Sequence, residues 1–127
     1  MLAKAEQALQ RRASRLAEAG SFDDLHTEVC DAIGCIRGIG DLAIYDIAHR
    51  VGAYLKLEPE LVYLHAGARG GARALGLSGN SISPGQLPTE LQILTAAELE
   101  DCLCIYKGWL RRGSRTAQAC IAQTHCA

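Results

Sequence analysis

The feature that most constrains the fold is the stretch from Cys30 to Leu55, in which two glycines interrupt a helical pattern. Gly38 and Gly40 bracket Ile39, and apolar residues recur every three or four positions on both sides of them. Glycine allows a tight turn because it tolerates positive φ, and the helix that follows begins with backbone N–H groups that have no helical partner. The pattern therefore predicts two helices joined by a short glycine turn with outward-facing amides.

Most of the first half of the chain also has the spacing of amphipathic helices. We expect helices over residues 2–18, 21–36 and 41–55, with Ser21 as the N-cap of the second. After the third helix, Pro59 stands at a favourable first position and predicts a further helix.

The second half contains a glycine-rich segment and a strong helix start. Residues 66–75 hold three glycines, which lower helix stability unless they permit close packing against a neighbour. Residues 76–86 are rich in turn residues and predict a loop. Thr95 and Glu98 match a capping box at the start of a helix. Its expected apolar face consists of Leu99, Leu103, Tyr106 and Leu110.

Length and composition fit one small helical domain. The chain has 127 residues, 49% apolar and only 5% aromatic, so its core must be mainly aliphatic. We predict an all-α fold, a compact bundle of five or six helices around the glycine turn, over residues 1–112. Residues 113–127 lose the helical period and are predicted to form a frayed or disordered tail.

The six cysteines and the hydropathy bear on location and cofactors. No apolar run approaches the roughly 20 residues that cross a bilayer, so we expect a cytoplasmic protein without a membrane partner. The cysteines are then expected to be mostly reduced thiols, with Cys30, Cys35 and at least one of Cys102 and Cys104 buried. Their spacing matches neither a zinc nor an iron–sulfur site, so no metal or other cofactor is predicted.

The turn Ile36-Arg37-Gly38-Ile39-Gly40 resembles the hairpin of the helix-hairpin-helix superfamily. The resemblance extends over residues 21–77 to the DNA glycosylases built on that hairpin, through Val62 to His65 and a later Leu-Gly step. It implies that the hairpin amides bind the phosphate backbone of double-stranded DNA without reading sequence. The implied contacts are made by Arg37, Gly38, Ile39 and Gly40, supported by Arg69 and Arg73.

Two residues that the glycosylase reaction requires are absent. Lyase members carry a lysine just past the second hairpin glycine, and the glycosylases carry an aspartate after the hairpin helix. This chain has Leu42 and Tyr63 there. The resemblance therefore implies the scaffold without the reaction, and we expect no catalytic residues. Asp41 is a further departure, since its carboxylate stabilises a helix start but repels an incoming phosphate.

Two other functions stay open. A protein–protein interaction module, in which the turn only packs two helices, is favoured by the net charge of −1. An enzyme, whether related to DNA repair or of another type, would need His49 or His65 within reach of a carboxylate such as Asp46 in a cleft. The four tyrosines and the one tryptophan, expected in the core or at its rim, do not alternate with arginines as a base-stacking surface would. They are Tyr45, Tyr54, Tyr63, Tyr106 and Trp109.

Overall fold

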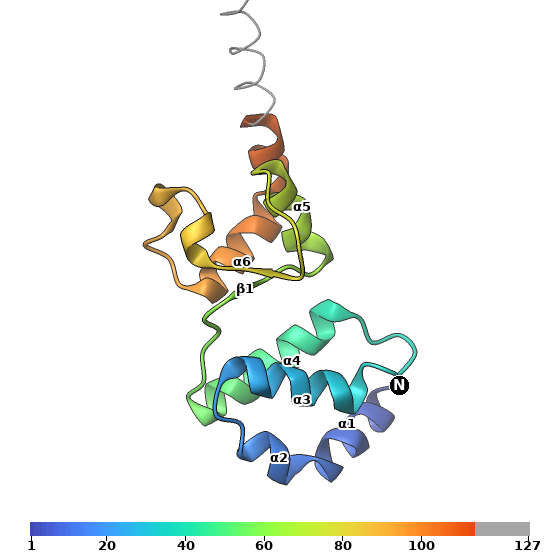
Figure 1. Cartoon of the computed structure of the whole chain (residues 1–127). Helices are drawn as coiled ribbons and strands as arrows, with labels where there is room; N and C mark the ends of the chain where they lie inside the picture. The colour runs from blue at the N-terminus through green and yellow to red at the C-terminus, as the bar shows by residue number, and fades with distance from the viewer. Residues whose placement is uncertain (114–127) are drawn as a thin grey trace, which may run out of the picture. The chain divides into compact units, whose positions relative to one another are not determined.

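The structure is a computed structural model that describes residues 1–113. The protein is mostly helical, as predicted (Figure 1). Its chain divides into two compact units, residues 1–60 and the residues from Leu61 onward. The predicted domain of residues 1–112 thus comprises both units, and the predicted tail, residues 113–127, lies outside the described residues apart from Gly113.

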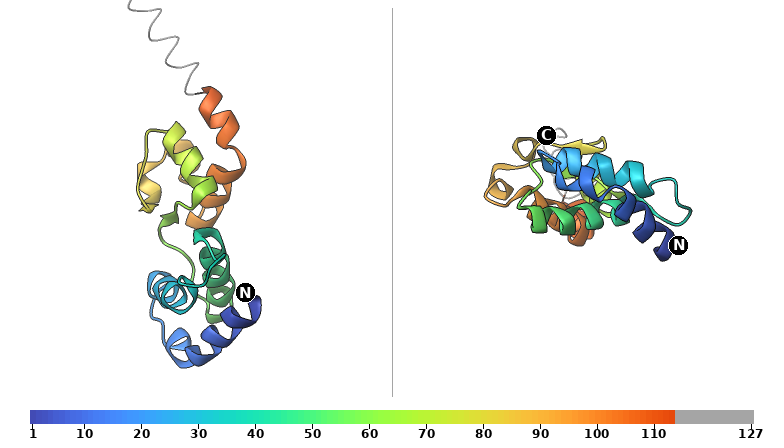
Figure 2. Two further views of the ribbon diagram at one scale, coloured as in Figure 1. Left: turned by 90° about the vertical axis from the view of Figure 1, so that its right-hand side faces the viewer. Right: turned by 90° about the horizontal axis from the view of Figure 1, so that it is seen from below.

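The first unit consists of four helices, which Figure 2 shows from two further sides. They are α1 (Leu2–Arg11), α2 (Ala13–Ala17), α3 (Phe22–Ile33) and α4 (Asp41–Leu55). The helix expected over residues 2–18 is therefore broken at Arg12, whose ψ of 9° leaves the helical range. Helix α3 packs against the other three. The buried apolar residues of this unit are Ala5, Leu16, Phe22, Leu25, Val29, Ile33, Ile44, Tyr45 and Ala48.

The ends of α3 and α4 follow from local chemistry. Ser21 caps α3 as predicted, because its Oγ accepts the N–H of Asp24 at 3.1 Å. Helix α4 ends where Lys56 adopts a left-handed conformation with φ of 60°. The N–H of Leu57 then donates to the carbonyl of Gly52 at 2.8 Å, which completes a Schellman motif.

The prediction that Pro59 starts a helix is wrong. The left-handed residue at the end of α4 turns the chain into an irregular segment, and Pro59 is buried there. This segment leads into a short strand instead.

The second unit combines two helices with a minimal strand pair. It contains β1 (Val62–Tyr63), α5 (Ala66–Ala74), β2 (Ser81–Ile82), the 3-10 turns η1 (Pro84–Gln86) and η2 (Thr89–Leu91), and α6 (Ala96–Ile105). Residues 107–113 are helical as well. The strands are antiparallel, with Val62 opposite Ile82 and Tyr63 opposite Ser81. The core consists of Val62, Leu64, Ala68, Ala72, Ile82, Leu87, Ala96, Leu99 and Leu103.

Glycines in α5 allow close packing on α6, which confirms what the glycine-rich segment predicts if it is helical. A Cβ built on Gly71 would lie 2.8 Å from the Cα of Leu103, and one on Gly67 would lie 2.5 Å from the Sγ of Cys104. The predicted capping box is also present. The N–H of Glu98 donates to Thr95 at 3.3 Å, and that of Thr95 donates to Glu98 at 2.8 Å.

Several burial predictions are wrong because of where the residue lies on its helix or relative to the end of the helix. Cys30 is exposed because it lies one position beyond the buried Val29, and Cys35 is exposed in the turn. Cys102 and Cys104 are half-buried. Tyr106 is 52% exposed because α6 ends just before it.

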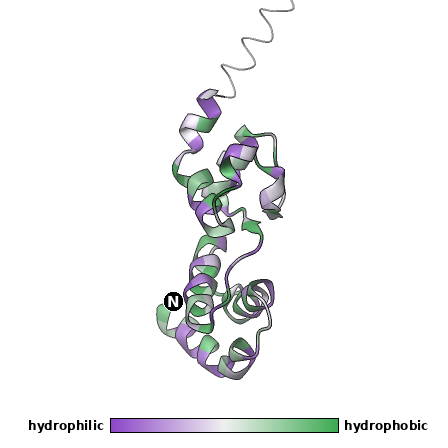
Figure 3. Cartoon of the chain, turned by 90° about the vertical axis from the view of Figure 1, so that its left-hand side faces the viewer, coloured by the Kyte–Doolittle hydropathy of each residue, from purple (hydrophilic) through white to green (hydrophobic). Residues whose placement is uncertain are grey.

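Polar and apolar residues alternate along the helices of both units (Figure 3). Within residues 1–113, no helix combines the length and the apolar character that a membrane span requires.

Candidate functional site

The turn between α3 and α4 is the teal loop of Figure 1, beside the N-terminus. Backbone hydrogen bonds shape it: the N–H of Ile36 donates to Ile33 and that of Ile39 donates to Ile36, each at 3.0 Å. Gly38 has φ of +95°, a conformation that side chains with a Cβ rarely adopt. Met1 lies against this residue, since a Cβ on Gly38 would be 2.5 Å from the Met1 Sδ.

Gly40 is the N-cap of α4, and nothing in its surroundings demands a glycine. Its φ of −111° and ψ of 179° are extended values that any residue adopts. A Cβ built on it would meet no atom within 4 Å. Ser, Asp or Asn there would cap the helix better than Gly does. The consequence of glycine is that the first turn of this 15-residue helix has no side-chain cap.

The predicted residues of the turn differ in accessibility. Arg37, Gly38 and Gly40 are exposed, and Ile39 is half-buried. Asp41 is exposed in the first turn of α4, where its carboxylate interacts favourably with the helix dipole.

His26 on α3 is a neighbour of this turn that sequence reasoning missed. Burial lowers the pKa of His26, and the negative charges of Asp23 and Asp41 oppose that shift. The imidazole therefore stays largely neutral at pH 7. Because Asp41 acts on it, protonation of His26 at lower pH would offset part of the negative charge beside the turn.

The two arginines predicted to support the turn both lie on α5 of the second unit, one helical turn apart. Arg73 is exposed. Arg69 is half-buried, and its Nη2 donates to the carbonyl of Leu64 at 3.0 Å. Arg69 thus also ties α5 to the end of the preceding strand.

The two histidines considered for acid–base chemistry contact groups of the protein core or of a helix start. His49 lies in an aromatic cluster, stacked on Tyr45 with ring centroids 5.6 Å apart and edge-on to Phe22 at 6.4 Å. Asp46, the carboxylate considered as an acid–base partner of these histidines, is exposed. His65 is buried and belongs to the other unit, where it is the N-cap of α5.

His65 is paired with Glu100, a residue that the sequence analysis did not single out. Its Nδ1 accepts the N–H of Gly67 at 3.2 Å, so the proton must be on Nε2, which donates to the Oε1 of Glu100. Both residues are buried, at 4% and 5% exposure. Glu100 shares a helix face with Ala96, Leu99 and Leu103. This position among apolar residues is the sequence feature that could have identified Glu100 as a buried, paired residue. The pair joins α5 to α6 inside the unit.

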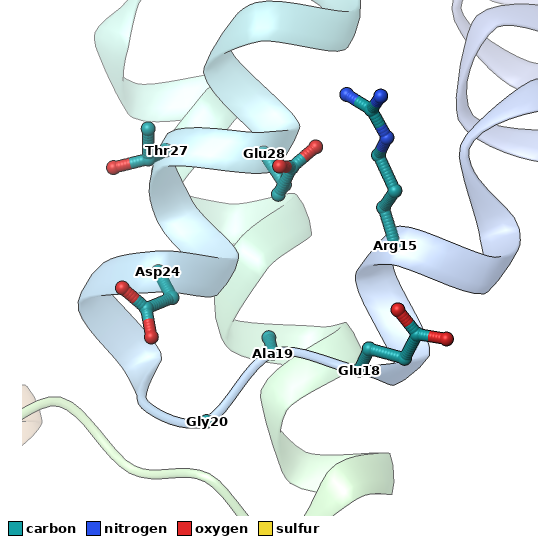
Figure 4. A pocket seen from close by; sticks show the side chains of 7 residues that line it. All are labelled: Arg15, Glu18, Ala19, Gly20, Asp24, Thr27 and Glu28. Atoms are coloured by element: carbon teal, nitrogen blue, oxygen red, sulfur yellow. The ribbon is translucent and has the colours of Figure 1, made fainter.

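A polar pocket of about 420 Å³ lies in the first unit, where α2 leads into α3 (Figure 4). An ion pair between Arg12 and Glu28, at 3.0 Å, joins these parts of the chain. None of the predicted site residues lines the pocket. Its lining is Arg15, Glu18, Ala19, Gly20, Asp24, Thr27 and Glu28. Within residues 1–113, no three His, Cys, Asp or Glu side chains gather as a metal site would require.

The chain matches no protein-family model, no curated protein and no solved structure.

Proposed function

We propose that this is a non-catalytic helix-hairpin-helix protein that binds the backbone of double-stranded DNA without reading its sequence. The hairpin is α3, the turn and α4, and the contacts are made by Arg37, Gly38, Ile39 and Gly40. We include in the proposal a cytoplasmic location, where thiols such as the free Cys30 and Cys35 remain reduced.

The observation that carries the proposal is the uncapped start of α4. Gly40 has open space around it and an ordinary extended conformation, so glycine is not needed there for folding. A capping residue would stabilise the helix by a few tenths of a kcal/mol over glycine, but its side chain would occupy the first-turn amides. Glycine keeps those amides accessible to a phosphate, which also benefits from the positive end of the helix dipole.

Charged side chains near the turn include one that attracts phosphate and one that repels it. The exposed guanidinium of Arg37 attracts phosphate, whereas the carboxylate of Asp41 repels it. With a net charge of −1 for the whole chain, binding has to come from local groups, so we expect moderate affinity. Arg73 and, in part, Arg69 add positive charge on α5.

Mobility-shift titration of a random-sequence duplex tests the proposal. Affinity should fall steeply as salt rises, because bound phosphates release counterions. Arg37→Ala should weaken binding of all sequences alike and reduce the salt dependence by about one phosphate, or roughly 0.9 in the log–log slope. Absence of any shift at low salt would refute it.

A protein–protein interaction module is the second candidate, and one observation favours it. Apolar side chains gather beside the turn: Met1 is 59% exposed and lies against Gly38, and Leu42 is 50% exposed in the first turn of α4. Such side chains suit a protein partner better than a phosphate. This reading predicts that Leu42→Gln impairs partner binding while Arg37→Ala does not. The DNA proposal predicts the opposite order for duplex affinity.

A further inference from the structure

Two cations of the helical segment 107–113, which follows α6 in Figure 1, lie against α5 of the same unit. A Cβ built on Gly70 of α5 would lie 3.5 Å from the Cδ of Lys107 and 3.6 Å from an Nη of Arg111. Both residues are exposed, and they stand one helical turn apart. The side chains of Lys107 and Arg111 are therefore neighbours at the edge of α5, above one glycine.

Arg73 of α5 adds a third cation beside this glycine. A helix turns by about 100° per residue, so Arg73 lies about 60° from Gly70, and Gly71 lies about 100° away on the other side. Gly71 packs against the backbone of Leu103, which places Gly70 at the border of the contact with α6 and Arg73 outside it. Arg73 is exposed. We call the three exposed cations that border Gly70 the basic cluster: Arg73, Lys107 and Arg111.

The basic cluster has little opposing charge around it. Within residues 1–113, no ion pair includes any of its three members. Residues 61–89 and 102–113 contain no Asp or Glu, and Glu100 of α6 is buried against His65. Like charges one helical turn apart repel each other. An anion that contacted both Lys107 and Arg111 would therefore relieve an unfavourable interaction.

Trp109 and Arg112 of the same segment are not part of the basic cluster. Trp109 lies about 160° around the helix from both Lys107 and Arg111. It is 69% exposed, against the expectation that it belongs to the core or its rim, and the guanidinium carbon of Arg112 lies 4.2 Å from the centroid of its ring. The side of the segment that carries the basic cluster thus presents cations and no aromatic ring.

We propose that the basic cluster is a second binding site for the phosphate backbone of duplex DNA, separate from the α3–α4 turn. Its guanidinium and ammonium groups donate to phosphate oxygens, which positions a duplex without reading its sequence. Because this side of the segment has no ring that could stack on an unpaired base, its chemistry suits the backbone alone. The inference rests on the proposed function for the class of ligand, whereas its residues and its unit differ from those of the turn.

An anionic lipid surface is the main competing ligand, because cations and tryptophan also occur together on interfacial helices. Such a helix inserts an apolar face into the membrane next to its cations. Here Leu110, the half-buried residue of the segment, packs against the protein core, and Trp109 lies on the other side from the cluster. The cationic side of the segment therefore has no apolar group to insert, which favours a polyanion such as the DNA backbone.

The salt dependence of duplex affinity, measured by mobility shift with the full chain, tests the inference. Each phosphate contact contributes roughly 0.9 to the log–log slope, so Lys107→Gln and Arg111→Gln should each lower the slope by about that amount. Lys107→Arg keeps the charge and should keep the slope. The matched control is Arg112→Gln, which removes one charge from the same segment outside the cluster and should leave the slope unchanged.

Urea unfolding of the same variants separates binding from a structural role. Because the members of the basic cluster are exposed and of like charge, replacement of Lys107 or Arg111 by Gln should leave the unfolding midpoint unchanged or slightly raised. A lowered midpoint together with an unchanged salt slope would overturn the inference, since the side chains would then serve the packing of α5. Circular dichroism checks that each variant is folded.

Separate variants distinguish this inference from the proposed function. If Arg37→Ala lowers the slope and Arg111→Gln does not, the inference is overturned and the turn remains a DNA site. If only Arg111→Gln lowers it, the inference holds and the proposed function fails. Equal losses for Arg111→Gln and Arg112→Gln would overturn the inference in favour of net charge alone. Binding of phosphatidylserine vesicles that requires Lys107 and Arg111, with no such requirement for duplex, would overturn it in favour of a membrane surface. Absence of duplex binding by the wild type at low salt would overturn both.

Discussion

The imidazole of His65 donates a hydrogen bond to the carboxylate of Glu100 inside the second unit, so that a buried polar pair joins α5 to α6. The other ring nitrogen accepts from Gly67, which leaves both nitrogens satisfied. The pair is oriented by the backbone on one side and by a helix on the other. Because both residues are buried, we expect the pair to stabilise the unit rather than to act chemically on a bound molecule.

Removal of the Glu100 side chain should therefore destabilise the protein. Glu100→Ala leaves the buried N–H of His65 without its acceptor, which costs about 2–4 kcal/mol in free energy of unfolding. Glu100→Gln keeps an acceptor oxygen and should cost distinctly less. Urea titrations of both variants measure the difference, and equal losses would show that the hydrogen bond contributes little.

Adjacent glycines of α5 should respond in opposite ways to the same substitution. Gly71→Ala places a methyl group against the backbone of Leu103, so one of the helices must shift, at a cost of about 1–3 kcal/mol or more. Gly70→Ala meets only side chains at 3.5 Å or beyond and should stabilise the helix by up to about 1 kcal/mol. Thermal unfolding of the two variants tests this, and equal melting temperatures would contradict the close packing.

The stability of the first unit should depend on the protonation of His26. Burial lowers its pKa in the folded protein below the ordinary 6.5, so the unfolded chain binds more protons as the pH falls through that value. The free energy of unfolding should therefore be constant above pH 6.5 with respect to this group and decrease below it. His26→Gln removes this contribution, and denaturant midpoints from pH 7.5 to 5 should then fall less steeply. An unchanged slope would show that other groups cause the dependence.

Replacement of Gly40 by a capping residue should raise the stability of the protein and lower its affinity for duplex DNA. Gly40→Ser adds an N-cap, so α4 should gain a few tenths of a kcal/mol. Its hydroxyl would compete with phosphate for the same amides, so duplex affinity should fall about three- to tenfold. Unfolding and mobility-shift titrations on one preparation measure both, and a gain in both would contradict this role of the amides.

The local part of the fold could be predicted from sequence. The cap at Ser21, the capping box of Thr95 and Glu98 and the turn before Asp41 depend on residues a few positions apart, which sequence displays directly. The glycines of α5 predicted close packing but not the partner helix, because that depends on contacts distant in sequence.

The errors have separate causes. Pro59 is compatible with a helix start, but the left-handed Lys56 before it redirects the chain. Tyr106 is exposed because α6 ends at Ile105, a boundary that apolar spacing does not reveal. Trp109 is exposed because it lies about 100° around the helical segment 107–113 from Leu110, which packs against the core. Glu100 was overlooked because the role of a charged residue on an apolar helix face depends on its partner. That partner, His65, lies 35 positions away in the sequence.

The most direct test of the central claim is a comparison of duplex affinity for Gly40→Asp and Gly85→Asp. Both add one negative charge at an exposed glycine with ordinary backbone geometry, but only the first lies at the start of α4. If the uncapped amides bind phosphate, Gly40→Asp should weaken duplex binding about tenfold or more, a change of about 1.4 kcal/mol, because the carboxylate occupies the site. Gly85→Asp should change it less than twofold. Equal effects of the two substitutions would contradict the claim.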